Sequence, residues 1–314
     1  MKIVVLDGYT LNPGDLTWEG LEAFGDVTVY DRSLPEEIAD RIRDADIVVA
    51  NKANLTRQAL AEAKQLKYIT VMATGYDCVD AAAARDLGIV VSNVPTYGTD
   101  TVAQFTLALI LELAHQIGRH SQSVRAGEWT SASDWCYTLS PQVELMGKTL
   151  GIIGYGRIGQ RVGELARAFG MQVITVERPG RAFDVPSVSL EEIFRQSDIL
   201  TLHCPLTQFT RGIVNARSLA LMKPGAFLIN ASRGPLIVEE DLRRALDEGV
   251  IAGAALDVLS MEPMPEGHIL REAPNLIITP HIAWSTKEAR IRILDSTMRN
   301  IRSYLAGEPR HRVI

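Results

Sequence analysis

Residues 154–159 read Gly-Tyr-Gly-Arg-Ile-Gly, a G-x-G-x-x-G turn that directly follows the apolar run 150–153. In a dinucleotide-binding turn, the first glycine permits a tight bend and the second lets the backbone lie against a pyrophosphate. The third lets the next helix pack close to the strand. The apolar residues that follow, up to Ala166, recur at helical spacing. Because the N–H groups at the start of a helix attract phosphate, this stretch predicts a strand, a turn and a helix that bind a dinucleotide.

The glycine motif alone also occurs in tight turns that bind nothing, so its surroundings matter. Here a second apolar run, 173–176, ends at Glu177, roughly 20 residues after the turn. A carboxylate at that place binds the ribose hydroxyls of the adenosine half of a dinucleotide. These surroundings favour a nucleotide site over an ordinary turn.

The bulk composition limits the remaining possibilities. The chain has 314 residues, enough for two domains, and is 46% hydrophobic and 22% charged, as is typical of a soluble globular protein. Its net charge of −6, with both signs dispersed, disfavours a nucleic-acid surface. No segment has the length and apolarity of a membrane span, and residues 1–6 read as a core strand and not as a signal peptide. Cys78, Cys136 and Cys204 are too far apart for a disulfide framework or a metal cluster, so we expect no metal and a cytoplasmic location.

Short apolar runs alternate with helical segments along most of the chain, the pattern of parallel sheets covered by helices. In the first part, the predicted strands are 3–6, 27–30, 47–50, 68–71 and 89–92, and the predicted helices are 35–43, 57–66 and 79–87. A second series of alternating predicted strands and helices begins at Thr149. Its predicted strands, 150–153, 173–176, 199–202, 226–229, 253–256 and 276–278, match a full dinucleotide-binding sheet.

Between the two series, residues 101–126 are predicted to form one long helix with Thr99 or Asp100 as its N-cap. That length exceeds a connector within one small sheet, so the helix should link two domains. The last helix, 286–305, has no strand after it, and we expect it to return to the first domain. The predicted fold is α/β, with two Rossmann-like, doubly wound and mostly parallel domains and a cleft between them. The predicted substrate domain comprises residues 1–98 and 287–314, and the predicted nucleotide domain comprises residues 99–286.

Polar side chains follow the last three predicted strands, at the edge where open parallel sheets bind ligands. Arg233 follows the first of these strands, and Asp257 and Glu262 follow the second. His281 follows the third. Taken singly, each has an ordinary interpretation as a solvated arginine, a surface turn or a structural histidine. Their convergence at one edge favours a site.

This combination suits the reduction of a 2-keto acid. The planar guanidinium of Arg233 matches a carboxylate, and His281 can deliver and recover a proton near neutral pH. Glu262 can fix the tautomer of the histidine and stabilise its cationic form. Asp257, directly at a strand end, is placed to contact the nicotinamide end of the cofactor.

At these residues the chain resembles the D-isomer-specific 2-hydroxyacid dehydrogenase family, over nearly its whole length. The resemblance rests on the glycine turn and on four further motifs: His203-Cys204-Pro205-Leu206-Thr207, the stretch 222–234 that ends in Asn230-Ala231-Ser232-Arg233-Gly234, the stretch 253–258 with Glu262-Pro263, and Thr279-Pro280-His281-Ile282-Ala283. The stretches 70–77, 176–180 and 281–284 are most similar to glycerate dehydrogenases, also called hydroxypyruvate reductases.

The resemblance implies a catalytic set of Arg233, Glu262 and His281 and a homodimer built largely through the nucleotide domain. It implies cofactor contacts by Gly154, Gly156, Arg157, Ile158, Gly159, Glu177, His203, Pro205, Thr210, Ala231, Ser232 and Asp257. It implies substrate contacts by Lys52, Ala73, Thr74, Gly75, Tyr76, Arg233 and Trp284, of which Lys52, Tyr76 and Trp284 could equally be packing or surface positions. Trp135 is a candidate to reach the partner's active site.

Two features refine these implications. Glu177 stands where the family usually has Asp, and a carboxylate there should repel the 2′-phosphate of NADP, so NAD is favoured. Arg178 and Arg181 are close enough in sequence to attract that phosphate, which leaves NADP use open. Glu262 points to ketone reduction, because formate dehydrogenases of this superfamily lack the glutamate partner of the histidine.

The predicted function is therefore the NADH-preferring reduction of small 2-keto acids, with hydroxypyruvate and glyoxylate giving D-glycerate and glycolate. One alternative is a D-lactate-type dehydrogenase that acts on pyruvate or longer keto acids. The other is an NAD(H)-sensing binding protein similar to transcriptional corepressors. The expected partner is a small-molecule acid, with no nucleic acid and no membrane.

Overall fold

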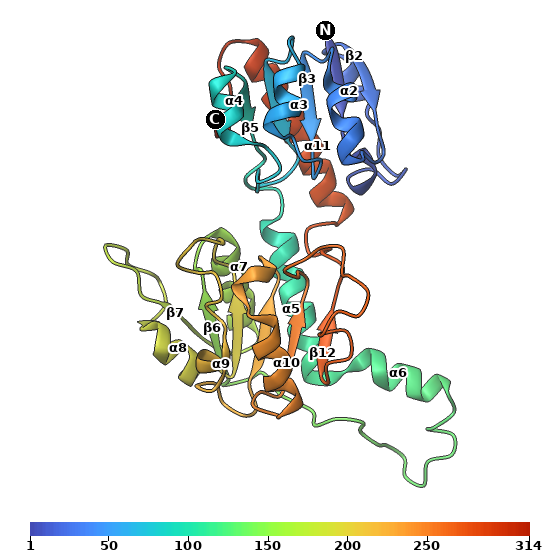
Figure 1. The fold of residues 1–314 in the computed structure, drawn as a ribbon. Helices are drawn as coiled ribbons and strands as arrows, with labels where there is room; N and C mark the ends of the chain where they lie inside the picture. Colours follow the sequence, from blue (N-terminus) through green and yellow to red (C-terminus); the bar gives the residue numbers. More distant parts are fainter. The chain divides into compact units, whose positions relative to one another are not determined.

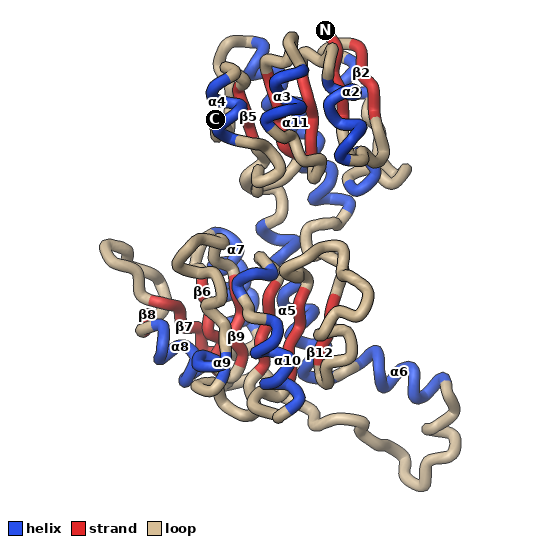
Figure 2. Tube along the Cα trace, viewed as in Figure 1, coloured by secondary structure: helices blue, strands red, loops and turns tan.

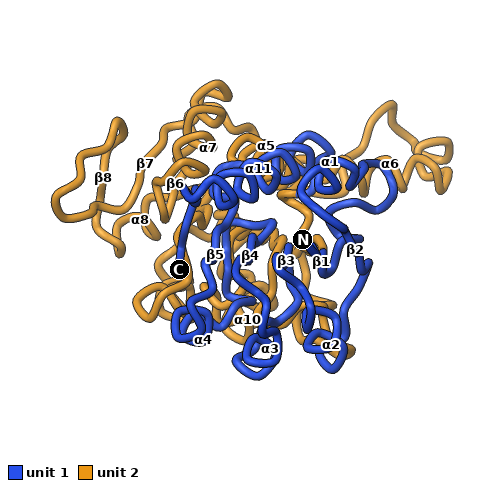
Figure 3. Tube along the Cα trace, turned by 90° about the horizontal axis from the view of Figure 1, so that it is seen from above, with its two compact units in different colours: residues 1–97, 285–314 blue, residues 98–284 orange.

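The computed structural model describes residues 1–314 and divides into two compact units. Unit 1 contains residues 1–97 and 285–314, and unit 2 contains residues 98–284 (Figure 3). Unit 1 is thus assembled from both ends of the chain. The chain passes between the units at 97–98 and 284–285, next to the boundaries predicted after residues 98 and 286.

The sheet of unit 1 has five parallel strands in the order β2-β1-β3-β4-β5 (Figures 1 and 2). They are β1 (Lys2–Val5), β2 (Asp26–Val29), β3 (Ile47–Ala50), β4 (Tyr68–Val71) and β5 (Val90–Ser92). β3 and β4 are buried along their whole length because helices cover both faces of the sheet.

Helices α2 (Ile38–Ile42), α3 (Arg57–Glu62) and α4 (Ala81–Asp86) lie on one face of this sheet, and α1 (Glu19–Glu22) and α11 (Lys287–Leu305) lie on the other (Figures 1 and 3). Thr56 and Asp80 begin α3 and α4, and each side chain accepts a hydrogen bond from the backbone of the first turn. The predicted helix 35–43 starts as a 3-10 turn, Pro35–Glu37, before α2. The apolar sides of α2, α3 and α4 share one core with the strands.

The sheet of unit 2 has seven parallel strands in the order β12-β11-β10-β9-β6-β7-β8. They are β6 (Thr149–Ile153), β7 (Gln172–Val176), β8 (Ser187–Val188), β9 (Ile199–Leu202), β10 (Phe227–Asn230), β11 (Gly253–Leu256) and β12 (Leu276–Ile278). The strand order reverses between β6 and β9, the place where doubly wound sheets bind ligands. The sequence predicted six of these strands. It missed β8, because two residues at a sheet edge leave no apolar run to detect.

Two apolar cores cover the faces of this second sheet. Helices α5 (Thr99–His115) and α7 (Arg157–Ala168) form one core with the strands. Helices α8 (Leu190–Gln196), α9 (Ala216–Leu219) and α10 (Glu239–Asp247) form the other. The N-cap of α5 is Gly98, so the predicted caps Thr99 and Asp100 lie inside its first turn.

The prediction of a single helix over 101–126 is wrong. Gln116 has φ 46° and ψ 47°, the left-handed conformation, and separates α5 from α6 (Ile117–Arg125). The Gln116 N–H donates to the carbonyl of Glu112, whose side chain accepts the N–H of Gly118. These two bonds supply an end for α5 that periodicity alone does not reveal. Figure 1 shows α6 and the loop after it extending from the body of unit 2.

No helix in the structure combines the length and the apolarity that crossing a bilayer requires. The three cysteines are free thiols, and no group of three or more His, Cys, Asp or Glu side chains is arranged to hold a metal ion.

Candidate active site

The glycine turn joins β6 to α7 where the strand order reverses. Gly154 has a φ of +102°, and a Cβ there would collide with the backbone of His203 and Cys204. A Cβ at Gly159 would collide with the carbonyl oxygen of Gly154. The protein itself therefore requires both glycines, one for the turn and one for the close approach of α7.

Gly156 is required for another reason. Its φ is −88°, and no atom lies within 4 Å of a Cβ built there. The space beside it is open, and α7 begins there without a side-chain cap. A pyrophosphate lying against this backbone accounts for a glycine that no protein contact demands. Glu177 is exposed and directly follows the neighbouring strand β7, at the place where the ribose of a dinucleotide binds. The glycine turn and Glu177 therefore fit a dinucleotide.

Two strand-end loops meet beside the glycine turn. In the loop after β9, the hydroxyl of Thr210 donates to the carbonyl of Pro205 at 2.7 Å. In the loop after β10, the hydroxyl of Ser232 donates to the carbonyl of Cys204 at 2.9 Å, which ties the two loops together. Burial lowers the pKa of His203 to about 4, so its ring is neutral at physiological pH.

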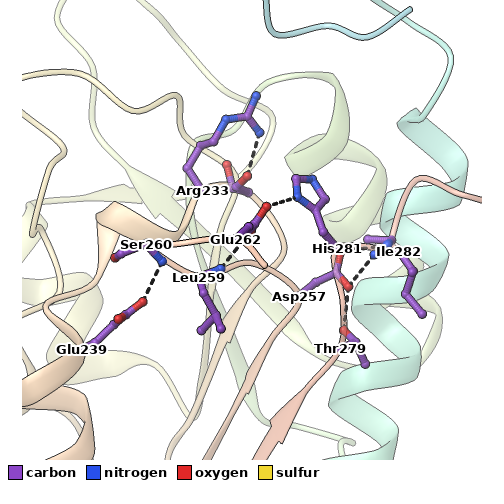
Figure 4. A network of polar contacts seen from close by, with 11 residues as sticks. Arg233, Glu239, Asp257, Leu259, Ser260, Glu262, Thr279, His281 and Ile282 are labelled. Atoms are coloured by element: carbon purple, nitrogen blue, oxygen red, sulfur yellow. Dashed lines mark hydrogen bonds and ion pairs between the residues drawn. The ribbon is translucent and has the colours of Figure 1, made fainter. Parts of the chain in front are cut away.

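Arg233 follows β10, and its backbone is fixed by the fully buried Asn230. The side-chain amide of Asn230 donates to the Arg233 carbonyl at 2.9 Å and accepts the Ser232 N–H at 3.0 Å. The guanidinium donates to the Ser232 carbonyl at 2.8 Å, and the side chain stays partly exposed (Figure 4). This arrangement presents a planar fork that can bind a carboxylate.

His281 and Glu262 form an ion-pair contact at the same edge. Nδ1 of His281 lies 2.7 Å from Oε2 of Glu262, and the two side chains are 29% and 36% exposed. The other carboxylate oxygen accepts the N–H of Leu259 at 3.0 Å, which fixes its orientation. With Nδ1 turned to the carboxylate, Nε2 is the ring nitrogen that can exchange a proton with a bound molecule.

The loop that carries His281 is held by Asp257, which is 1% exposed and directly follows β11. His281 itself has a φ of +55°, which is uncommon outside glycine. One Asp257 oxygen accepts from the Thr279 hydroxyl at 2.6 Å and from the Ile282 N–H at 2.9 Å. The other accepts from the Ala283 N–H at 2.8 Å. Burial raises the pKa of Asp257, and these hydrogen bonds oppose that shift.

The predicted substrate contacts of unit 1 lie at one edge of its sheet. Lys52 follows β3, and residues 73–76 follow the neighbouring strand β4. The side chain of Asn93 donates to the Thr74 carbonyl at 2.7 Å, which fixes this loop. Trp284 is the last residue of unit 2 and is partly buried.

Sequence reasoning missed several residues that support the site. Asn230 ends a buried apolar strand, where its side-chain amide requires hydrogen-bond partners. That position indicates a structural role for Asn230 and could have been used to predict it. Thr279 belongs to the same motif as His281, but a threonine before a proline gives no separate signal of a hydrogen bond to a distant carboxylate. Glu239 and His268, which contact each other near Glu262, come from distant segments without any shared pattern.

Comparison with known proteins adds four findings. Residues 107–283 match the family model of the D-isomer specific 2-hydroxyacid dehydrogenase NAD-binding domain. The chain is 49% identical to the hydroxypyruvate reductase of Blautia hydrogenotrophica, over 98% of both chains. It is 42% identical to the glycerate dehydrogenase of Methylorubrum extorquens, over 88% of both chains. Among solved structures, it is similar to an acyclic imino acid reductase in complex with NADPH and D-Arg, with a TM-score of 0.88, 32% identity and full coverage of both chains.

Proposed function

Because the chain belongs to the D-isomer specific 2-hydroxyacid dehydrogenase family, we propose that it reduces hydroxypyruvate and glyoxylate to D-glycerate and glycolate, preferring NADH. It is an NAD-dependent oxidoreductase, and its similarity to a hydroxypyruvate reductase and a glycerate dehydrogenase supports 2-keto acid reduction. The single observation that carries the proposed chemistry is the contact of His281 with Glu262 at the sheet edge that also carries Arg233.

When bound, the reduced cofactor supplies the hydride to the keto carbon. Arg233 binds the substrate carboxylate through its planar fork and so orients the neighbouring carbonyl. His281 donates the proton on Nε2 to the carbonyl oxygen, while Glu262 holds Nδ1 and stabilises the cationic ring. In the reverse direction, the same nitrogen accepts the proton from the hydroxyl.

The proposed cofactor contacts lie at the glycine turn and at the ends of the neighbouring strands. The backbone of the glycine turn and the first residues of α7, Arg157 and Ile158, hold the pyrophosphate, and Glu177 holds the adenine ribose. The remaining contacts come from the two tied loops and the adjoining strand end, namely His203, Pro205, Thr210, Ala231, Ser232 and Asp257. The carboxylate of Glu177 favours NAD, whereas Arg178 and Arg181 offer positive charge for the extra phosphate of NADP.

The substrate is also held by unit 1. The proposed contacts are Lys52, Ala73, Thr74, Gly75 and Tyr76, with Trp284 from unit 2. Two observations support these contacts. The residues from unit 1 follow the adjacent strands β3 and β4 at the same edge of the sheet, and a hydrogen bond from Asn93 fixes the loop at Thr74. Backbone groups of such a loop suit a small polar acid.

We also propose a homodimer built through unit 2, in the cytoplasm. Trp129 and Trp135, on the segment that extends beyond α6, are 52% and 86% exposed. The indole nitrogen of Trp129 donates to the carbonyl of Trp135 at 3.0 Å, which holds these two positions of the segment together. Exposed aromatic surface of this kind is typical of a protein interface, and Trp135 is the candidate to reach the partner's active site.

The test is the consumption of NADH and NADPH, followed by absorbance, with hydroxypyruvate, glyoxylate, pyruvate, phenylpyruvate and oxaloacetate. Fast loss of NADH with hydroxypyruvate and slow loss with pyruvate is the expected result. Faster turnover of pyruvate or phenylpyruvate would replace the proposed substrate with that of a D-lactate-type enzyme.

A further inference from the structure

We propose that Glu239, oriented by His268, is a positioning residue that sets the place of Glu262 against His281. It does so through the peptide bond between Leu259 and Ser260. This inference rests on the proposed function, because it gives Glu239 a part in the proton transfer at His281.

Hydrogen bonds and the backbone of residues 259–260 connect Glu239 to Glu262 and His281 (Figure 4). Glu239 is the first residue of α10, and its Oε1 accepts the N–H of Ser260 at 2.7 Å. The neighbouring N–H, that of Leu259, donates to Oε1 of Glu262 at 3.0 Å. Two successive peptide N–H groups are therefore held by two carboxylates. A displacement at Ser260 moves the Leu259 N–H and, with it, the carboxylate of Glu262.

His268 holds the second oxygen of Glu239. Its Nε2 lies 3.1 Å from Oε2 of Glu239, and the side chains are 8% and 11% exposed. Nδ1 of His268 accepts the N–H of Leu270 at 3.3 Å, so Nε2 is the ring nitrogen whose N–H faces the carboxylate. Both oxygens of a nearly buried carboxylate are thus partnered, which fixes its orientation far better than a surface ion pair would.

The backbone at Gly234 also packs closely against this peptide. A Cβ at Gly234 would overlap the carbonyl group of Leu259 and the nitrogen of Ser260. The peptide is therefore held by close packing against Gly234 and by the hydrogen bond to Glu239, and loss of the carboxylate removes the second of these constraints.

Binding of the substrate carboxylate by Arg233 should not depend on Glu239. Arg233 adjoins Gly234, but the buried Asn230 fixes the backbone here separately, by donating to the Arg233 carbonyl and accepting the Ser232 N–H. Loss of Glu239 should therefore disturb the step that uses His281 and leave substrate binding intact. This separates a positioning role from a general loss of structure.

The experiment compares Glu239→Ala with Glu240→Gln, in the otherwise unchanged protein and in a Glu262→Gln background. Glu240 is the neighbour on the same helical turn, so it controls for the lost charge. We expect Glu239→Ala to lower kcat for hydroxypyruvate about 10- to 100-fold, as misplacement of a catalytic group by about 1 Å does. The KM should not change. In the Glu262→Gln background, Glu239→Ala should cause no further loss, because both act through one interaction.

Equal losses of kcat in both backgrounds would overturn the inference, as would a rise of KM with kcat unchanged. If Glu239→Ala fails to fold by circular dichroism, Glu239→Gln takes its place. The amide keeps an acceptor for Ser260 but faces Nε2–H of His268 with a donor, so a smaller loss of kcat is expected, again absent in the Glu262→Gln background. Full activity of Glu262→Gln alone would contradict the proposed function itself, an outcome distinct from failure of this inference.

Discussion

Nδ1 of His281 lies 2.7 Å from a carboxylate oxygen of Glu262, although the two residues belong to different strand-end loops. Each partner is fixed from its own side. Glu262 accepts the Leu259 N–H, and the backbone around His281 donates to the buried Asp257. This double support lets a partly exposed pair keep one geometry, which a catalytic proton donor requires.

Replacing His281 with Ala should lower kcat for keto acid reduction by about 10² to 10⁴-fold, because the protein then lacks its proton donor. The dissociation constant of NADH, measured by fluorescence titration, should stay the same. A comparable loss of NADH binding would contradict the acid–base role and indicate a general disruption of the site.

Replacing Arg233 with Ala should raise the KM for hydroxypyruvate by about 10- to 100-fold, because the substrate carboxylate loses charge-assisted hydrogen bonds. Arg244→Ala removes the same charge from an exposed position of α10 and serves as the control. An unchanged KM in Arg233→Ala, measured in steady-state assays, would exclude Arg233 as the carboxylate clamp.

Replacing Glu177 with Ala should raise the ratio of kcat/KM for NADPH over NADH by roughly tenfold. The variant loses both a hydrogen-bond acceptor for the ribose and a charge that repels the 2′-phosphate. Glu144→Ala, at an exposed position before β6, is the matched control. If the ratio of kcat/KM for NADPH over NADH is the same in the unchanged protein, Glu177→Ala and Glu144→Ala, Glu177 does not contact the ribose.

The partly buried His203 should make the fold sensitive to acid. Its pKa is about 4 in the folded protein and about 6.5 in the unfolded chain, so the unfolded chain binds the proton more readily. The stabilising contribution is complete above pH 6.5 and is lost as the pH falls toward 4. Compared with His203→Gln, the unchanged protein should lose on the order of 1–2 kcal/mol of unfolding free energy between pH 7.5 and pH 5. Parallel urea unfolding curves at the two pH values provide the measurement, and an identical pH dependence would contradict the lowered pKa of His203.

Much of the fold could be predicted because the physical signals are local. Buried parallel strands appear in the sequence as continuous apolar runs, and the spacing of the glycines predicts the geometry of the turn between β6 and α7. Because parallel strands end at one edge, the sequence predicts that Arg233, Glu262 and His281, which follow successive strands, lie at the same edge of the sheet. The family assignment from these motifs is confirmed by the match over residues 107–283 and by the relatives.

The remaining features depend on contacts between distant segments. The break at Gln116 is fixed by hydrogen bonds of Glu112, and neither a proline nor a glycine occupies position 116. Asp257 could be placed at a strand end, but its bonds to the loop of His281 require the two segments to be folded together. The contact of Glu239 with His268 joins a helix start to a remote loop, a pairing that no periodicity encodes.

The most direct measurement is the amount and chirality of glycerate formed from hydroxypyruvate with NADH. We predict stoichiometric oxidation of NADH with D-glycerate as the only glycerate isomer, and loss of this product in His281→Ala. Formation of L-glycerate or a racemate, or no product while NADH still binds, would contradict the proposed function.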